Sequence, residues 1–238
     1  MARRIRIQYP GALYHVTSRG NRRAPIFIDD RDHLIWLDLL GKMVEHHHIV
    51  VHSYVQMPNH YHLLAETPEG NLSAGIHFLN GHYAQHFNKR RQLSGHVFQG
   101  RFYAEPIEHQ AHLLALARYL ALNPVRAELV ESPENWRWSS YAGLSGGLPS
   151  QACVHDAWLL SQFAGADRHA RLDAYRAFVA QGMGMEHPLK CRYEAKGRSL
   201  INSSGILEAE SSGKYTVREI AERFSVSERT VYRIIRSP

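Results

Sequence analysis

The chain has 238 residues and carries 28 lysines and arginines against 22 acidic residues, which gives a formal net charge of +6. Two cysteines are too few for a disulfide framework or a cysteine-rich zinc site. No segment is apolar over the roughly 20 residues that a membrane-spanning helix needs, and none has the pattern of a secretory signal. We therefore expect a cytoplasmic protein without a membrane partner, and the basic excess agrees with a nucleic-acid partner.

The first 28 positions of the chain contain several arginines and no acidic residue. Clustered cations suit the phosphates of a nucleic acid, whereas the alternative is a solvated basic face. The predicted DNA-binding residues of this stretch are Arg3, Arg4, Arg6, Arg19, Arg22 and Arg23.

The hydrophobic pattern of the first half of the chain predicts an α+β fold. Apolar alternation predicts strands, and apolar residues at helical spacing predict helices. The expected elements are a strand over 12–21, a helix over 29–47, strands over 49–56 and 60–66, a helix over 71–88 and a strand over 97–107. This β-α-β-β-α-β order is that of the ferredoxin-like antiparallel sheet. The acidic group of Asp29, Asp30 and Asp32 is expected to cap the first helix.

Two histidines lie two positions apart on the strand predicted over 60–66. Successive strand side chains point to opposite faces, so His60 and His62 should project together. Imidazole is a common ligand for divalent metals, and two imidazoles on one strand make half of a metal site. The alternative is an incidental pairing, since the chain has 17 histidines.

A second stretch without acidic residues runs from position 70 to position 104. Its aromatic residues include Tyr83, Phe98 and Phe102. Cations for the backbone and aromatic faces for unstacked bases suit a single strand or a hairpin, and the alternative is a basic face over core aromatics. The predicted DNA-binding residues of this stretch are Lys89, Arg90, Arg91 and Arg101.

Leucines and alanines at helical spacing predict a further helix over 112–122, which Pro124 is expected to stop near Asn123. Tyr119 and Asn123 are then neighbours on one helical face, with Cβ atoms roughly 6 Å apart. A phenol that can attack, an amide beside it and the histidine pair would form a nucleophile-and-metal set. Without the histidines, Tyr119 would be interpreted as a packing tyrosine.

Four segments together resemble the REP-associated tyrosine transposases, which belong to the single-tyrosine transposases named HUH for His, a hydrophobic residue and His. The segments occur in the family's order across roughly residues 5 to 145. They are MPNHYHLL at 57–64, GHVFQGRF at 95–102, RYLALNPVRA at 118–127 and WRWSSY at 136–141.

The resemblance implies that His60 and His62 hold a divalent ion, Mg²⁺ or Mn²⁺, and that Tyr119 is the nucleophile. Tyr61 takes the hydrophobic position between the histidines. Asn123 stands where related transposases place a polar third ligand, often a glutamine, and it has a shorter reach.

The implied activity is cleavage and rejoining of single-stranded DNA at palindromic hairpins through a 5′-phosphotyrosine. Arg118 and Arg126 would stabilise the phenolate or contact phosphate, and a homodimer is a possible assembly. The alternatives are a non-catalytic regulator that binds hairpins, a rolling-circle or relaxase-type initiator, and hydrolysis by metal-activated water.

The resemblance places a catalytic domain at 1–145. The residue pattern beyond it predicts a helical extension at 146–185, a Gly- and Ser-rich linker at 186–213 and a helix-turn-helix at 214–238. Ser227 is a natural N-cap for the second helix of that last unit. Residues Arg229, Thr230 and Arg233 are then candidates to enter a major groove, and the alternative is a packing or dimer element.

Overall fold

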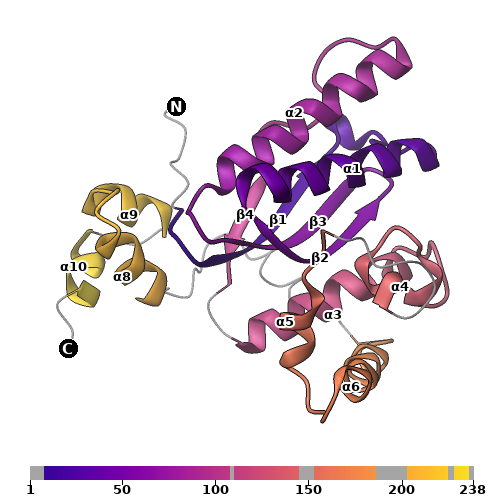
Figure 1. Cartoon of the computed structure of the whole chain (residues 1–238). Helices are drawn as coiled ribbons and strands as arrows, with labels where there is room; N and C mark the ends of the chain where they lie inside the picture. Colours follow the sequence, from indigo (N-terminus) through magenta and orange to yellow (C-terminus); the bar gives the residue numbers. More distant parts are fainter. Residues whose placement is uncertain (1–7, 108–109, 145–152, 186–202, 225–227, 236–238) are drawn as a thin grey trace.

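A four-stranded sheet forms the centre of the molecule, with two long helices on one face and a third across the other (Figure 1). This computed structural model describes residues 8–107, 110–144, 153–185, 203–224 and 228–235. The predicted α+β class is confirmed. The strands are β1 (Ala12–Arg19), β2 (Val50–Met57), β3 (His60–Thr67) and β4 (Tyr103–Pro106).

The strand order is β2-β3-β1-β4, and every neighbouring pair is antiparallel. Helix α1 (Asp30–His47) connects β1 to β2, and α2 (Leu72–Arg91) connects β3 to β4. This is the ferredoxin-like arrangement that the element order predicts. Strand β4 is shorter than the strand predicted over 97–107, because Gly100 adopts a positive φ angle of 70° that does not fit a strand.

Helix α1 and the sheet form the main core. Asp29 is the N-cap of the helix, and its side chain accepts a hydrogen bond from the amide of Asp32 at 3.2 Å, as predicted. The ring centroids of Trp36 and Tyr61 lie 4.7 Å apart. Tyr61 therefore faces α1, which leaves the side chains before and after it in β3 on the opposite face.

Helix α3 (Gln110–Arg126) crosses that opposite face. Its Leu113, Leu116 and Leu120 pack in one cluster with residues of β2 and β3. The prediction that Pro124 stops the helix near Asn123 is wrong, since α3 continues to Arg126. A proline removes one amide donor, and the chain still closes the last turn with hydrogen bonds such as Leu129 N to Pro124 O at 3.0 Å.

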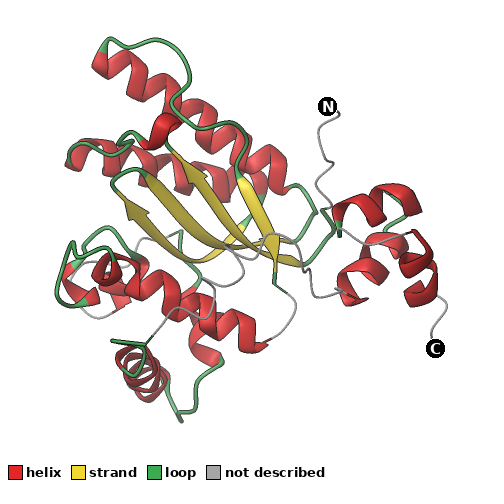
Figure 2. Cartoon of the chain, turned by 180° about the vertical axis from the view of Figure 1, so that it is seen from behind, coloured by secondary structure: helices red, strands yellow, loops and turns green. Residues whose placement is uncertain are grey.

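The segment after α3 covers the outer edge of β2. The amide of Gln56 donates to the carbonyl of Trp138 at 2.9 Å, and the indole of Trp136 donates to the carbonyl of Gln56 at 2.8 Å. A second apolar cluster then joins α3 to the shorter helices below it (Figure 2). The elements of this region are η2 (Pro133–Asn135), α4 (Ser140–Leu144), α5 (Asp156–Ser161) and α6 (Arg168–Ala180).

Three helices at the C-terminal end pack beside β4, away from α3 to α6 (Figure 2). They are α8 (Ser203–Ser211), α9 (Val217–Arg223) and α10 (Glu228–Ile235). Helix α8 lies within the segment expected to be a linker. Its Ile206 and Ala209 are fully buried and pack in the core. The turn at 225–227 lies outside the described residues, so the helix-turn-helix remains a prediction. Among the helices of the described ranges, none is long and apolar enough to cross a membrane.

An ion-pair network links the start of α1 to the end of α2. The Asp32 carboxylate is 2% exposed and accepts from Arg90 Nη1 at 2.6 Å and from Arg91 Nη2 at 2.7 Å. Asp29 binds the same two guanidinium groups at 2.7 and 2.8 Å, which holds its pKa well below the usual range. The two helices are thereby joined at their ends by charge-assisted hydrogen bonds.

Replacing Asp32 should destabilise the protein strongly. In Asp32→Asn two partly buried guanidinium groups lose a charged partner, and we expect the free energy of unfolding to fall by about 2 kcal/mol. The matched control is Asp38→Asn, since Asp38 forms an exposed pair with Lys42 at 2.7 Å and should change stability by less than about 0.5 kcal/mol. Urea unfolding measures both, and equal effects would contradict the structural role of the network.

Candidate active site

The pairing of β1 with β3 gathers polar side chains on the sheet face that α3 covers. In this register Thr17 lies opposite His62, and Arg19 lies opposite His60. The His60 and His62 rings have centroids 4.9 Å apart and an interplanar angle of 86°. The two imidazoles therefore project together, as the alternation in β3 predicts.

Helix α3 brings Tyr119 to the histidines. The centroid of the Tyr119 ring lies 5.3 Å from that of His62 and 6.2 Å from that of His15. One helical turn later, the side chain of Asn123 is buried and hydrogen-bonds with the phenol. The guanidinium carbon of Arg126 lies 6.0 Å from the centroid of the phenol ring. A phenol, an amide, a guanidinium and an imidazole pair thus share one region.

The Tyr119 hydroxyl is a weak acid in this region. Burial raises the pKa of its phenol, and the hydrogen bond with Asn123 together with the charges of Arg126 and Arg19 acts in the opposite direction. Because burial is the largest effect, the phenol keeps its proton at neutral pH. Attack by Tyr119 therefore requires that its proton leaves as the new bond forms.

The neighbouring Asn59 fixes the ring of His60. The amide nitrogen of Asn59 donates to the carbonyl of Arg23 at 3.0 Å, and its amide oxygen lies 2.7 Å from His60 Nδ1. Burial, aided by the charge of Arg19, lowers the pKa of His60 to about 4, so its imidazole is neutral at pH 7. A neutral ring that donates from Nδ1 carries its lone pair on Nε2.

Two residues that sequence reasoning missed hold His62. Its Nδ1 lies 2.9 Å from Thr17 Oγ1 and 2.9 Å from Nε2 of the buried His15. Thr17 Oγ1 also lies 3.3 Å from His15 Nε2, so the three groups form one network. Alternation in β1 separates His15 and Thr17 from the core residues Tyr14 and Val16, but only the register of β1 on β3 shows that they reach His62.

Two donors close to Tyr119 complete the site. Asn123 Nδ2 and Arg126 Nη1 are buried, and neither has a hydrogen-bond partner within the described ranges. Burial also lowers the pKa of the Arg126 guanidinium below its ordinary value. Buried donors without partners are costly, and a phosphate oxygen is the type of acceptor that would satisfy them.

Comparison with known proteins agrees with this geometry. The family described as "Transposase IS200 like" matches residues 8–123, which include both histidines and end four residues after Tyr119. This segment is an IS200-like transposase domain. No curated protein sequence matches the chain.

Two solved structures are similar to this chain. The REP-associated tyrosine transposase bound to a REP hairpin has a TM-score of 0.53 and 19% sequence identity, over 66% of this chain and 93% of that chain. At this identity the similarity shows a shared fold. A candidate transposase from Deinococcus radiodurans R1 has a TM-score of 0.37 and 15% identity, over 50% of this chain and 95% of that chain, which is too low to support an argument.

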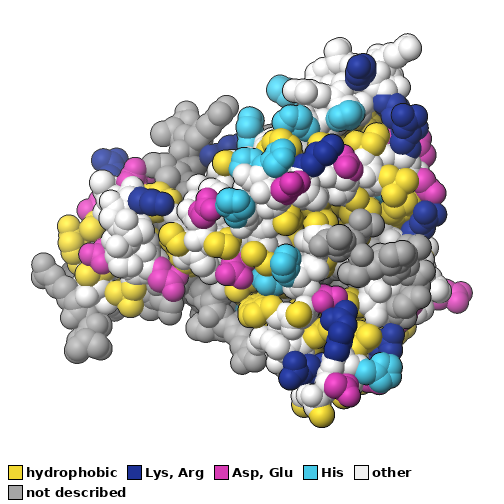
Figure 3. Space-filling view, viewed as in Figure 1, with side chains coloured by type: hydrophobic (Ala, Val, Ile, Leu, Met, Phe, Trp, Pro, Cys, Tyr) yellow, Lys and Arg dark blue, Asp and Glu magenta, His cyan; other side chains and the backbone are white. Residues whose placement is uncertain are grey.

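The donors of the transposase domain fit one divalent ion. His60 and His62 offer imidazoles held by other side chains, and the Asn123 side chain carries an amide oxygen. Within the described part of the chain, three or more His, Cys, Asp or Glu side chains do not gather into a metal-binding group. The histidines on the surface over α1 and α2 (Figure 3) likewise form no such group within the described residues. A site at β3 would therefore combine two imidazoles with amide, phosphate or water oxygens, which suits Mn²⁺ better than Mg²⁺.

Some of the predicted DNA-binding cations are exposed. Arg19 lies at the end of β1, and Arg22 and Arg23 lie in the adjoining loop, η1 (Asn21–Arg23). Lys89 and Arg101 are exposed as well. Arg3, Arg4 and Arg6 and the side chains of Arg229, Thr230 and Arg233 lie outside what the structure describes.

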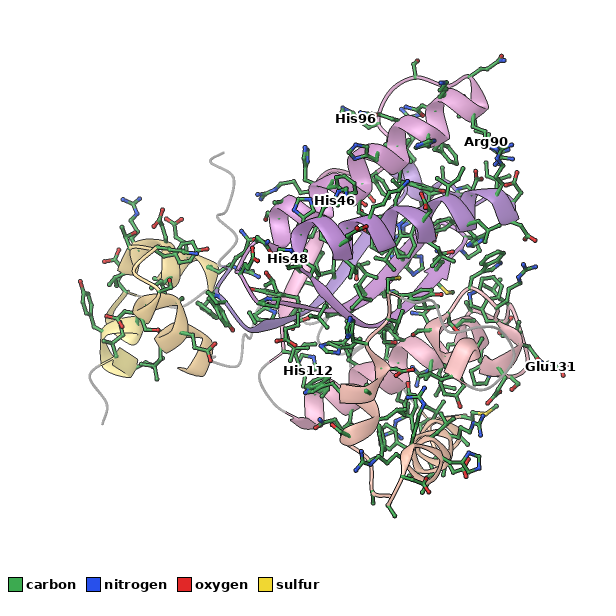
Figure 4. All side chains as sticks on the ribbon, in the orientation of Figure 1. His46, His48, Arg90, His96, His112 and Glu131 are labelled. Atoms are coloured by element: carbon green, nitrogen blue, oxygen red, sulfur yellow. The ribbon has the colours of Figure 1, made fainter. Side chains whose placement is uncertain are left out.

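Other predicted cations have partners within the fold. Arg90 and Arg91 bind Asp29 and Asp32, and Figure 4 shows Arg90 at the C-terminal end of α2. The guanidinium carbon of Arg118 lies 3.8 Å from the centroid of the Phe178 ring in α6. Their charges are therefore less available to DNA than the sequence suggests.

The aromatic residues of the second basic stretch do not form a stacking surface. Tyr83, Phe98 and Phe102 are 1%, 9% and 8% exposed and belong to the main core. The interpretation of these rings as platforms for bases is wrong, because they are needed to cover the sheet face under α1 and α2.

The pKa of His60 provides a test of this site. In the metal-free protein we expect its imidazole to titrate near pH 4, because burial disfavours the charged ring, and not near the ordinary value of 6.5. The unfolded chain takes up the proton more readily, so this group's contribution to stability is lost as the pH falls from about 6.5 to 4. NMR of the imidazole nitrogens measures the pKa, with His60→Gln to assign the signal. Titration at 6.5 or above would show that the ring is solvated.

Proposed function

We propose that this transposase cleaves and rejoins single-stranded DNA at palindromic hairpins through a 5′-phosphotyrosine on Tyr119. The observation that carries the proposal is the position of the Tyr119 ring, 5.3 Å from the ring of His62 and on the same side of the sheet as His60. A packing tyrosine would need neither the paired imidazoles nor the buried donors that surround this one.

In the proposed reaction the Tyr119 oxygen attacks the phosphorus atom of a DNA phosphodiester. The bond from phosphorus to the 3′ oxygen breaks, the phenol loses its proton, and the departing 3′ oxygen takes up a proton. The energy of the phosphodiester remains in the phosphotyrosine, so the 3′-hydroxyl of a strand can attack it and release Tyr119. Cleavage and joining are then one reaction in two directions and need no nucleotide cofactor.

The residues around Tyr119 would stabilise the charge that develops on the phosphate. Arg126 and Asn123 lie on the same helical face as the phenol, with buried donors that can bind phosphate oxygens. His60 and His62 would hold the divalent ion, with Asn123 as the candidate third ligand, and a bound ion polarises a phosphate oxygen. Since Asn123 contacts the phenol in this structure, we favour its role toward Tyr119 and the phosphate.

The proposed substrate rests on charge and on the solved relative. That relative is described as bound to a REP hairpin. In this chain Arg19, Arg22 and Arg23 are exposed on the β1 end and the loop beside His60, where they could bind the backbone of a strand that enters the site. Nucleophile and histidines belong to one chain, so a homodimer is not needed to assemble them. We propose that the protein acts in the cytoplasm.

Covalent capture of DNA tests the proposed reaction. With Mn²⁺ and end-labelled hairpin DNA, the wild-type protein should form an adduct that survives denaturing electrophoresis. Tyr119→Phe should form none, because the phenylalanine ring has no nucleophilic oxygen, and His60→Ala should lower the yield by about 100-fold. Hairpin binding by Tyr119→Phe, measured in parallel, is the control for folding.

Other outcomes would favour the alternatives. Cleavage that persists in Tyr119→Phe would indicate attack by a metal-activated water. Tight hairpin binding without cleavage on any tested flank would favour a regulator. Cleavage of a nicking site without a hairpin would favour a rolling-circle or relaxase-type initiator.

A further inference from the structure

The turn between β2 and β3 holds the loop that carries Arg22 and Arg23. The carbonyl of Asn59 accepts from the amide of Gly20 at 2.8 Å, and the carbonyl of Pro58 accepts from Ile26 and Phe27 at 2.8 and 3.0 Å. The Asn59 side chain adds a hydrogen bond to the carbonyl of Arg23 at 3.0 Å. Two residues of one hairpin turn therefore fix both ends and the middle of the loop.

The loop is strained between these contacts. Arg22 and Arg23 have φ angles of 54° and 61°, a left-handed conformation that residues with a Cβ atom rarely adopt. A Cβ atom on Gly20 would lie 2.1 Å from the carbonyl oxygen of Ala24, so the loop closes tightly on itself. Such a conformation persists where the surroundings enforce it, and the contacts from Pro58 and Asn59 are the ones that can.

One amide group serves both this loop and a histidine of the active site. A carbonyl can only accept, so the Asn59 side chain must turn its nitrogen to Arg23 and its oxygen to His60. That oxygen in turn requires a proton on His60 Nδ1 and places the lone pair of the neutral ring on Nε2. The orientation of the loop and the tautomer of His60 are thus set together.

We propose that Asn59 is a positioning residue that couples DNA binding by the Arg22–Arg23 loop to metal binding by His60. This inference rests on the proposed function, because it takes single-stranded or hairpin DNA and a divalent ion as the two ligands. A shared group held in one orientation links the two sites energetically, and such a linkage acts equally in both directions. DNA on the loop therefore favours the ion-binding form of His60, and the ion favours the loop conformation that binds DNA.

Two substitutions separate the hydrogen bonds of Asn59. Asn59→Ala removes both, so affinity for Mn²⁺ without DNA and affinity for hairpin DNA in EDTA should each fall by about 10-fold. Asn59→Asp keeps an oxygen for His60 but opposes the Arg23 carbonyl with a second acceptor. This variant should bind Mn²⁺ at least as tightly as the wild type and bind hairpin DNA about 10-fold more weakly.

The measurements are Mn²⁺ binding by electron paramagnetic resonance and hairpin binding by fluorescence anisotropy. The matched charge control is Asn21→Asp, which adds a carboxylate at an exposed position of the same loop. Its loss of DNA affinity should be clearly smaller than that of Asn59→Asp. Thermal unfolding of each variant shows whether it is folded, and Asn59→Asp decides alone if Asn59→Ala does not fold.

Several results would overturn the coupling. It is wrong if both Asn59 variants bind both ligands like the wild type, if Asn59→Ala weakens only one ligand, or if Asn21→Asp loses as much DNA affinity as Asn59→Asp. A wild-type protein that binds neither Mn²⁺ nor hairpin DNA would refute the proposed function itself, and this result is distinct from all of the others.

Discussion

The antiparallel register of β1 on β3 is the constraint on which the proposed active site depends. It places Thr17 opposite His62 and Arg19 opposite His60, on the face that α3 covers. Side chains in a strand alternate between faces, so a shift of one residue would move the β1 groups into the core under α1 and replace them with Val16 or Ser18. The large core around Tyr61 and Trp36 therefore matters for the proposed active site, because it makes any other register unfavourable.

Burial then determines the chemistry of the groups that the register assembles. Desolvation lowers the pKa of His60 and raises that of Tyr119, so both are neutral at pH 7. Neutral imidazoles can bind a cation, while a neutral phenol cannot yet attack. The same buried environment strengthens the interaction of Arg126 with any negative charge that develops nearby. A buried site with hydrogen-bond donors from Asn123 and Arg126 would suit an anionic transition state, and the phosphate of the substrate would bring most of that charge.

Sequence periodicity predicts the direction of side chains within one strand or helix. It does not predict the contacts between side chains of different elements. The spacing of His60 and His62 on one strand predicts their common direction. Periodicity does not predict the role of His15, because its contact with His62, 47 positions later in the chain, depends on the pairing of two strands. The same limit explains Arg90, whose acidic partners lie some 60 positions earlier. Phe98 shows a different limit, since an aromatic residue among cations suits a nucleic-acid surface and a core equally well.

Both outer strands of the sheet are covered by segments from later in the chain. On the β2 side this is the stretch around Trp136 and Trp138, and on the β4 side Arg223 donates to the carbonyl of Ala104 at 2.9 Å. Unpaired strand edges are templates for intermolecular β-sheet growth, and β4 is the strand at this edge of the sheet. The C-terminal helices thereby cover the β4 edge, and this cover would limit self-association of the sheet. A shortened chain that ended before α8 would expose this edge and would be prone to aggregate while the proposed catalytic residues were still in place.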